Sequence, residues 1–291
     1  MLKGIDIGGS FIKVLWEDGR KEKHFIGEIK KDRESFLSRI KEVALAGEPE
    51  GVGIAVAGFT SKGGKVYKSP NIPVLDGVDL RKLLAVEGVR VAVGNDVTLA
   101  AYGEWFFDYR QSETLVLIAI GTGLGGGFVA EGEPFFGVCG SSMEVGHHII
   151  VKDGHVCSCG RRGCWEAYCS AYGLERLYRE LGGGKLKDFE IARKAREGED
   201  IALQAVENFK DYLLTGLMNM VHIFNPDILV LGGGVVENLK PLLGDLEEVL
   251  KDIAVGLPAS CVRLRFSSAG EFLGARGALA FIKAHMSDIK S

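Results

Sequence analysis

The stretch Lys3-Gly4-Ile5-Asp6-Ile7-Gly8-Gly9-Ser10 has a counterpart in Leu117-Ile118-Ala119-Ile120-Gly121-Thr122-Gly123, further along the chain. Each is a short apolar run that predicts a buried strand, followed by a glycine-rich turn with one hydroxyl side chain. Each turn leads into a second apolar run, at residues 11–16 and 127–130, so both segments predict a hairpin. This repetition predicts a chain built from two similar αβ halves.

The remaining apolar patterns extend this prediction to the whole chain. Further strands are expected at residues 23–29, 51–57, 89–93, 227–231 and 262–266. Helices are expected at residues 32–46, 97–108, 165–181, 191–197, 201–224, 236–252 and 275–285. The fold class is therefore α/β, with duplicated mixed-sheet domains at 1–112 and 113–274. The last helix, about 275–291, is expected to pack back on the first domain.

Composition excludes several classes of protein. Hydrophobic residues make up 46% and charged residues 25%, which are values of globular domains. The net charge is −4 and no dense basic run occurs, so nucleic acid is not expected as a partner. No run of 18 uncharged apolar residues suggests a membrane span, and no apolar signal region precedes the first charge at Lys3. A cytoplasmic location is expected.

Three of the six cysteines fall close together and suggest a metal site. The pattern is His147, then Cys157, Cys159 and Cys164, which is typical of a closed tetrahedral zinc site of the Cys3His type. Ordinary buried cysteines are the alternative, but a disulfide framework is not expected in a chain of this length. Two glutamates, Glu144 and Glu166, flank these metal ligands in the sequence. The metal site would hold both carboxylates in place next to a bound polyhydroxylated molecule. Three further cysteines are predicted to be small core residues: Cys139, Cys169 and Cys261.

The two glycine turns are candidate phosphate sites. The backbone amides and the hydroxyl of residues 6–10 suit a phosphate, and Asp6 suits a hydrated magnesium ion; a plain β-turn is the alternative. Residues 121–127 contain G-x-G-x-x-G, but a strand rather than a helix is expected to follow, so dinucleotide binding is not predicted. A second phosphate-binding hairpin, with Thr122 as its hydroxyl, fits better.

Two other junctions between a strand and a helix carry candidate residues. Asn95 and Asp96 follow a buried strand; Asn95 either caps the next helix or projects with Asp96 into a ligand cleft. Asp96 would then be the general base that accepts a proton from an attacking hydroxyl. The glycines at 232–234 either lie against an adenine ring or a phosphate, or make a tight turn.

Taken together, these motifs resemble the ROK sugar kinases of the actin-like ATPase superfamily over essentially the whole chain. The resemblance rests on residues 6–10, 70–72, 94–96, 121–126, 144–147, 157–166 and 230–234. It implies a two-lobed actin-like ATPase (ribonuclease H-like) fold with a cleft between the lobes. It also implies ATP-dependent phosphorylation of a hexose or hexose derivative on a primary hydroxyl, with Asp96 as the base.

The resemblance also implies roles for individual residues. The expected sugar ligands are Gly58, Asn71, Asn95, Asp96, Glu144, His147 and Glu166. The expected sites for ATP and Mg²⁺ are Asp6, Gly8, Gly9, Ser10, Lys13, Gly121, Thr122, Gly123, Gly125 and Gly126, with Gly233 and Gly234 as further nucleotide contacts. His147, Cys157, Cys159 and Cys164 would hold a structural Zn²⁺. A homodimer is expected from the family alone.

The chain departs from the family pattern at several positions. Ser10-Phe11 stands where the first loop usually has Thr-Lys, although Lys13 lies on the same strand face as Phe11. Met143 stands where a glycine is usual, and would crowd the sugar pocket or shift the loop. Ala57 and the helix start at 97–99 also differ. These changes leave open a catalytically idle sugar-binding protein; a repressor is less expected, because the first strand starts at residue 2 and leaves no room for a DNA-binding region.

Overall fold

The computed structural model describes residues 1–61 and 63–287, which form two compact units. The first unit contains Met1–Gln111, Gly127–Ser142 and the chain from Glu271 onward. The second unit contains Ser112–Gly126 and Met143–Gly270. Each unit is described by itself below.

Two five-stranded mixed sheets have equivalent strand orders, which confirms the predicted α/β class and its duplication. The first order is β3-β2-β1-β4-β7, with strands Leu2–Ile7 (β1), Phe11–Trp16 (β2), Lys21–Phe25 (β3), Gly51–Val56 (β4) and Arg90–Asn95 (β7). The second order is β10-β9-β8-β11-β12, with strands Thr114–Ile120 (β8), Leu124–Ala130 (β9), Glu133–Pro134 (β10), Ile228–Gly232 (β11) and Arg263–Phe266 (β12). In each sheet a hairpin leads into strands joined in parallel.

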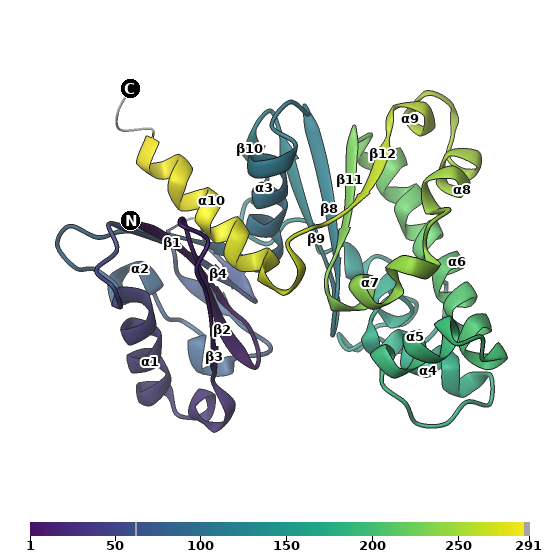
Figure 1. The fold of residues 1–291 in the computed structure, drawn as a ribbon, viewed down its shortest axis with the longest axis horizontal. Helices are drawn as coiled ribbons and strands as arrows, with labels where there is room; N and C mark the ends of the chain where they lie inside the picture. Colours follow the sequence, from purple (N-terminus) through teal and green to yellow (C-terminus); the bar gives the residue numbers. More distant parts are fainter. Residues whose placement is uncertain (62, 288–291) are drawn as a thin grey trace. The chain divides into compact units, whose positions relative to one another are not determined.

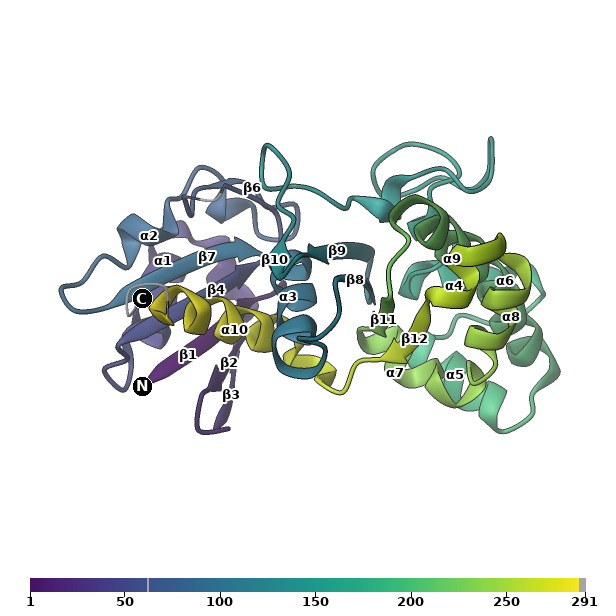
Figure 2. The same ribbon diagram turned by 90° about the horizontal axis from the view of Figure 1, so that it is seen from above.

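Helix α10 packs on one face of the first sheet. It runs over Leu273–Ser287 beside α3 (Asp96–Asp108), and Figure 1 and Figure 2 show the two helices next to each other. A Cβ atom on Gly4 would lie 2.0 Å from the carbonyl oxygen of Ala275, and one on Gly53 would lie 1.9 Å from that of Ala278. Only glycine at these positions lets the helix backbone come this close to the strands.

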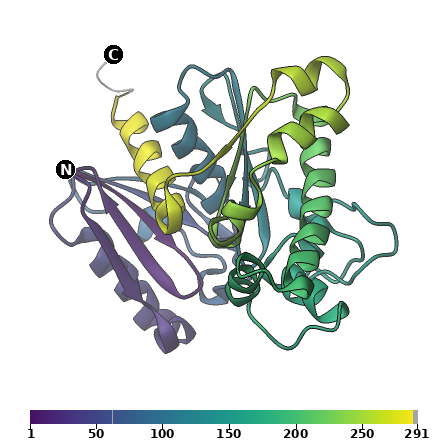
Figure 3. The same ribbon diagram turned by 45° about the vertical axis from the view of Figure 1, so that its right-hand side comes forward.

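The opposite face of the first sheet holds the core and α1 (Arg33–Leu45), so β1 and β2 lie between α10 and α1 (Figure 3). Ile5, Ile7 and Phe36 are buried there. The ammonium group of Lys3, on the same face, donates to the last carbonyls of α1, and burial lowers its pKa to about 8. Because side chains alternate along a strand, Asp6 projects to the other face, toward α10.

The second unit contains most of the helices that follow β10 in the chain. They are Ala171–Glu180 (α4), Asp188–Arg196 (α5), Asp200–Phe224 (α6), Gly234–Leu239 (α7), Leu246–Ile253 (α8) and Gly256–Cys261 (α9). The long α6 has α4 and α5 near one end and α8 and α9 near the other (Figure 1). None of the helices that the structure describes combines the length and the apolar character needed to span a membrane.

Shorter elements fill the connections. They are Phe59–Thr60 (β5), Val66–Lys68 (β6), Leu80–Leu83 (α2) and the 3-10 helices Gly27–Lys31 (η1), Pro73–Leu75 (η2), Val145–His147 (η3), Trp165–Ala167 (η4), Lys240–Leu242 (η5) and Gly270–Phe272 (η6). The sequence analysis placed η4 and η5 inside longer helices and did not predict the other elements of this group.

Several local predictions were wrong. The helix expected at 236–252 is two helices, α7 and α8, because Pro241 lacks the amide hydrogen that a continuous helix needs. The helix expected at 165–181 is interrupted before Ser170, which caps α4 with its hydroxyl. The strand expected at 23–29 ends at Phe25, since Gly27 has a positive φ and begins η1. Of the three predicted core cysteines only Cys169 is buried, and Cys139 and Cys261 are exposed.

The division into units differs from the predicted domains over residues 127–142, which belong to the first unit rather than the second. The reason is close backbone packing. A Cβ atom on Gly127 would lie 2.5 Å from the carbonyl oxygen of Val97 in α3, and one on Gly140 would lie 1.8 Å from that of Thr60. Segments held this closely belong to one packed body.

Candidate active site and metal centre

The turn between β1 and β2 presents open backbone. The Gly8 amide donates to the Phe11 carbonyl at 3.1 Å, and neither Gly8 nor Gly9 has a positive φ. A Cβ atom on Gly8 would lie 3.4 Å from the nearest protein atom, and one on Gly9 would lie 3.8 Å from the Cβ of Asn71. Packing within the protein therefore does not require glycine here, so close approach of a ligand is the better explanation. Asn71 lies beside this turn.

Two lysines lie near the same turn, and they differ in their partners. The ammonium of Lys13 donates to the Glu271 carbonyl at 2.7 Å and lies 3.9 Å from the Glu271 carboxylate. The ammonium of Lys30, in η1, donates to the carbonyl of Gly9 itself. The cation in direct contact with the turn is therefore Lys30, which the sequence analysis did not identify because it did not predict η1.

Asn95 caps α3, which was one of the two alternatives for this residue, and it also bonds Asp96. Its side-chain oxygen accepts from the amides of Val97 and Thr98 at 3.0 and 2.9 Å. Its amide nitrogen donates to the Asp96 carboxylate at 3.0 Å and to the Gly58 carbonyl at 3.1 Å. Gly58 has a φ of +146°, and a Cβ atom there would lie 2.4 Å from the Lys68 carbonyl. The fold thus requires glycine at position 58.

Asp6 and Asp96 are partly buried carboxyl groups of the first unit, and the charge of Asp96 acts on Asp6. Burial, and then the nearby Asp96 charge, raise the pKa of Asp6 to about 7, while Lys13 opposes the shift. Burial also raises the pKa of Asp96 above its usual value, and hydrogen bonds to its carboxylate oppose this. A Cβ atom on Gly274 would lie 2.8 Å from the Asp6 carboxyl carbon, so α10 leaves space for that group. Carboxyl groups with raised pKa values are typical of catalytic sites.

The turn between β8 and β9 in the second unit contacts Glu166. The Gly121 amide donates to the Gly123 carbonyl at 2.9 Å, and Thr122 is exposed. The Leu124 amide donates to the Glu166 carboxylate at 3.1 Å. A Cβ atom on Gly123 would lie 2.6 Å from the same oxygen, so a larger residue here would displace the Glu166 carboxylate.

Glu166 joins this turn to the cysteine-containing loop. It is only 7% exposed. Its second oxygen accepts from the hydroxyls of Ser158 at 2.6 Å and Tyr172 at 3.1 Å, and Cys157 Sγ lies 3.6 Å from it. Sequence reasoning missed Ser158 and Tyr172, although Ser158 occupies the position between two predicted metal ligands.

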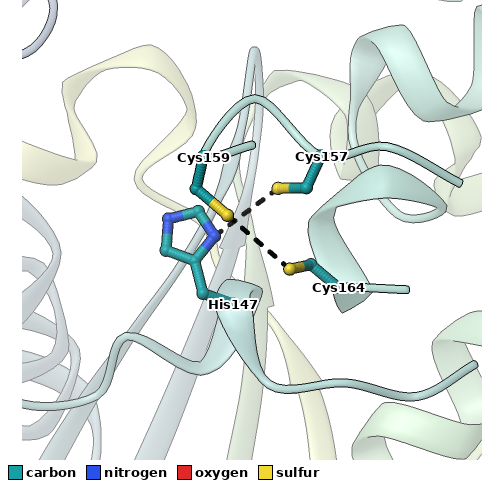
Figure 4. A group of neighbouring side chains, drawn as sticks. All are labelled: His147, Cys157, Cys159 and Cys164. Atoms are coloured by element: carbon teal, nitrogen blue, oxygen red, sulfur yellow. Dashed lines mark hydrogen bonds between the residues drawn. The ribbon is translucent and has the colours of Figure 1, made fainter. Parts of the chain in front are cut away.

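His147, Cys157, Cys159 and Cys164 converge as predicted, and their side chains point toward one another (Figure 4). One ligand atom from each lies within 4.8 Å of all the others. Sγ of Cys159 lies 3.7 Å from Sγ of Cys164, and Sγ of Cys157 lies 3.6 Å from Nδ1 of His147. A tetrahedral zinc ion with bonds of about 2.3 Å to sulfur and about 2.0 Å to nitrogen gives separations of about 3.8 and 3.5 Å. The residues present therefore fit Zn²⁺.

The same histidine has a second nitrogen directed elsewhere. Nδ1 of His147 faces the cysteines, while Nε2 lies 4.0 Å from the carboxylate of Glu144. Glu144 is 47% exposed at its side chain. A metal ion bound at Nδ1 would fix the orientation of the imidazole ring. Nε2 and the Glu144 carboxylate would then form a polar pair on the surface of this loop.

Gly233 and Gly234 have different environments after β11. Gly233 has a φ of +95°, and a Cβ atom there would lie 2.4 Å from the Ile120 carbonyl. Of the two alternatives for these glycines, the tight turn is found at Gly233. A Cβ atom on Gly234 would meet no other atom within 4 Å, so the chain itself does not require glycine there.

The model of the ROK family matches residues 3–285 of this sequence. The chain belongs to the ROK family. Among curated relatives of this ROK protein, the glucokinase of Thermotoga maritima is 32% identical over 97% of both chains. The N-acetyl-D-glucosamine kinase of Pectobacterium atrosepticum is 31% identical over 96% of this chain and 97% of its own. The xylose repressor of Bacillus subtilis is 30% identical over 82% of this chain and 62% of its own.

A solved structure supports the fold. The ROK glucokinase of Streptomyces griseus, crystallised with glucose and AMPPNP, is 26% identical over 97% of this chain and 99% of its own, with a TM-score of 0.81. The predicted actin-like ATPase fold of the ROK protein is thereby confirmed.

The structure shows the setting of two departures of this ROK protein from its family pattern. Met143 has a φ of +61°, a conformation that favours glycine and is uncommon for methionine. The Phe11 ring packs on Phe25 at 5.4 Å, and the ammonium of Lys23 lies 4.4 Å from its centroid. Phe11 therefore packs against β3.

Proposed function

We propose that this ROK protein is an ATP-dependent sugar kinase that phosphorylates a hexose or hexose derivative on a primary hydroxyl. The observation that carries the proposal is Asp96, a carboxyl group of raised pKa that is held by Asn95 and interacts with the charge of a second partly buried carboxyl, Asp6. The names of the kinase relatives and the glucose and AMPPNP in the Streptomyces griseus structure support it.

Asp96 is assigned the general base. A raised pKa favours the acceptance of a proton from a neutral hydroxyl, because base strength increases with pKa. Asn95 fixes the carboxylate at the start of α3. Asn71 and Gly58, which lie on neighbouring segments, are assigned to the sugar together with Asn95.

The nucleotide is assigned to the glycine turns. Residues 8–10 and 121–126 would bind the phosphates through backbone amides and the hydroxyls of Ser10 and Thr122, with Gly233 and Gly234 as further contacts. Asp6 would hold Mg²⁺ through water, and the ion would neutralise phosphate charge. The positive charge of Lys13 lowers the pKa of Asp6 and would thereby favour the ionised carboxylate that holds Mg²⁺.

Glu144, His147 and Glu166 are assigned to sugar hydroxyls, and zinc to a structural role. Four protein ligands leave no open position on the metal, whereas catalytic zinc keeps one. Both oxygens of Glu166 already accept hydrogen bonds from the chain. Besides its proposed contact with the sugar, Glu166 therefore holds the cysteine loop and the turn between β8 and β9 in place.

A coupled assay of ADP release tests the proposal. We expect ATP turnover with at least one of the hexoses, N-acetylhexosamines or aminohexoses offered, and the product should carry its phosphate on the primary hydroxyl. Sugar binding without ADP release across the panel would instead support a catalytically idle sugar-binding protein, the alternative that the repressor relative and Met143 favour.

Asp6→Asn should stabilise the protein and reduce its activity. A carboxyl pKa raised from 3.8 to about 7 costs about 4 kcal/mol at most when the group is ionised. The stabilisation should be present at pH 8, decrease as the pH falls through 7, and vanish below 3.8, where the folded and unfolded parent are both protonated. Denaturant unfolding of parent and variant at pH 8 and pH 5 measures this difference. Equal stability at pH 8 would contradict it.

Lys30→Met should raise the KM for ATP about tenfold, because it removes the ammonium that contacts the first phosphate turn. Lys31→Met is the matched control, since Lys31 is exposed and pairs with Glu28. Initial rates over a range of ATP concentrations check this, and a similar KM in both variants would remove Lys30 from the nucleotide site.

The oligomeric state and the location are proposed from the family and the cysteines. A homodimer would be seen by analytical ultracentrifugation at micromolar concentration. The Cys3His ligand set, which needs free thiols to bind a metal, supports a cytoplasmic location, where thiols are kept reduced.

A further inference from the structure

We propose that the second unit has a separate binding site for a small phosphate-bearing molecule, next to the cysteine loop. The site is a surface pocket of about 450 Å³. Its lining residues are His155, Val156, Arg162, Arg176, Arg179 and Glu180. None of these residues has a part in the proposed kinase reaction, so this inference does not depend on it.

The pocket carries an excess of positive charge, with three guanidinium groups and one carboxylate, that of Glu180, in its lining. In the described parts of the chain, none of the three guanidinium groups has a carboxylate within 4.0 Å. The carboxylate of Glu180 lies 3.4 Å from His155 instead. Three cations around one concave surface attract an anion, because the opposing charge is concentrated there.

The guanidinium groups are held by backbone carbonyls and keep donors for a ligand. Arg162 uses one terminal nitrogen for the Gly154 carbonyl at 3.2 Å. Arg179 uses only Nε, for the carbonyl of Glu175 in its own helix. Terminal N–H groups of both remain available to the pocket. Paired guanidinium donors match the oxygens of a phosphate.

The volume of the pocket indicates what carries the phosphate. A pocket of about 450 Å³ lies within the range of small-molecule sites, about 300 to 1,000 Å³, and exceeds what one phosphate needs. A phosphate carried by a small organic molecule therefore fits better than phosphate alone, and a phosphorylated sugar is the class that we test. Inorganic phosphate is the minimal probe of the same recognition.

The pocket is joined directly to the metal centre. Arg162 lies between the ligands Cys159 and Cys164 in the sequence. Arg176 donates to the carbonyls of Val156 at 3.2 Å and Ala167 at 3.4 Å, one residue from Cys157 and from Glu166. An anion that draws Arg162 and Arg176 together would restrain both ends of the cysteine loop and slow the loss of its metal.

Calorimetric titration of the full chain tests the site. The probes are sodium phosphate and a hexose 6-phosphate at constant ionic strength, with the parent, Arg162→Gln, Arg179→Gln and the control Arg193→Gln. Arg193 is exposed in the same unit and pairs with Glu197, so it lies outside the pocket. We expect the Kd to rise about tenfold or more in each pocket variant, and to stay within twofold in the control.

Comparison of the probes identifies the source of the phosphate. A hexose phosphate that binds at least tenfold more tightly than phosphate would assign a phosphorylated sugar, whereas equal affinities would assign the phosphate group alone. Zinc transfer to a chelator should slow with either probe in the parent and the control, and not in the pocket variants. Unchanged affinity in both pocket variants, or no binding by the parent, would overturn the proposal. Arg179→Gln keeps this test sound if Arg162→Gln fails to fold, because Arg179 bonds only its own helix.

Discussion

Asp96→Asn is expected to lower kcat by roughly 10²- to 10⁴-fold, the range for loss of a general base. The substitution keeps the shape of the side chain and an oxygen that can accept the amide hydrogen of Asn95. It removes only the ability to take a proton. Sugar affinity should therefore stay within a few-fold of the parent, because the other assigned sugar ligands remain.

Steady-state kinetics and sugar titration of the same preparation separate chemistry from binding. Asp18→Asn is the control, since Asp18 is an exposed acid of the first unit that pairs with Arg20. Turnover in Asp96→Asn above half the parental rate would exclude Asp96 as the base. Loss of sugar binding together with turnover would instead show that Asp96 acts mainly by holding the sugar.

Cys159→Ser is expected to release the metal and to weaken the second unit. The parent should contain about one zinc ion per chain, and the variant much less, because three remaining ligands hold zinc far more weakly than four. Loss of a structural metal belongs to the most destabilising changes, about 4 kcal/mol or more. Sugar affinity should fall at the same time, because Nδ1 of His147 and the bonds to Glu166 come from the same loop.

Metal analysis, denaturant unfolding and sugar titration check these three expectations. Cys261→Ser is the matched control, since Cys261 is an exposed cysteine of the same unit that lies in α9. It should change stability by about 0.5 kcal/mol or less. Absence of zinc from the parent, or a stable and metal-free Cys159→Ser that binds sugar normally, would refute the structural role of the metal.

The sequence predicted those features that depend on neighbours along the chain. The spacing of His147, Cys157, Cys159 and Cys164 predicted a metal cluster, and the structure brings the four side chains together. The paired hairpins predicted the duplicated sheets. The position of Asn95 between a strand and a helix offered capping as one of two alternatives, and the structure shows the cap. Local patterns suffice here because the loop, the turn or the cap is formed within a short segment.

Some failures lay in the reading of local signals, and others in packing. The breaks after Leu239 and before Ser170, and the start of η1, follow from Pro241, the Ser170 cap and the positive φ of Gly27, which the periodicity of apolar residues does not register. Cys139 and Cys261 were predicted to be buried from residue type alone, and the folded chain leaves both exposed.

By itself, therefore, the sequence determined the metal-ligand set, the hairpins and the cap, since each needs only a fixed spacing of residue types. The tertiary structure alone decided the enclosure of Asp6 under Gly274, the contact of Lys30 with Gly9 and the two-sided bonding of Glu166. These contacts join segments far apart in the chain or elements without a sequence signature. Their energetic consequences, above all the raised pKa of Asp6, arise only when folding removes the groups from water.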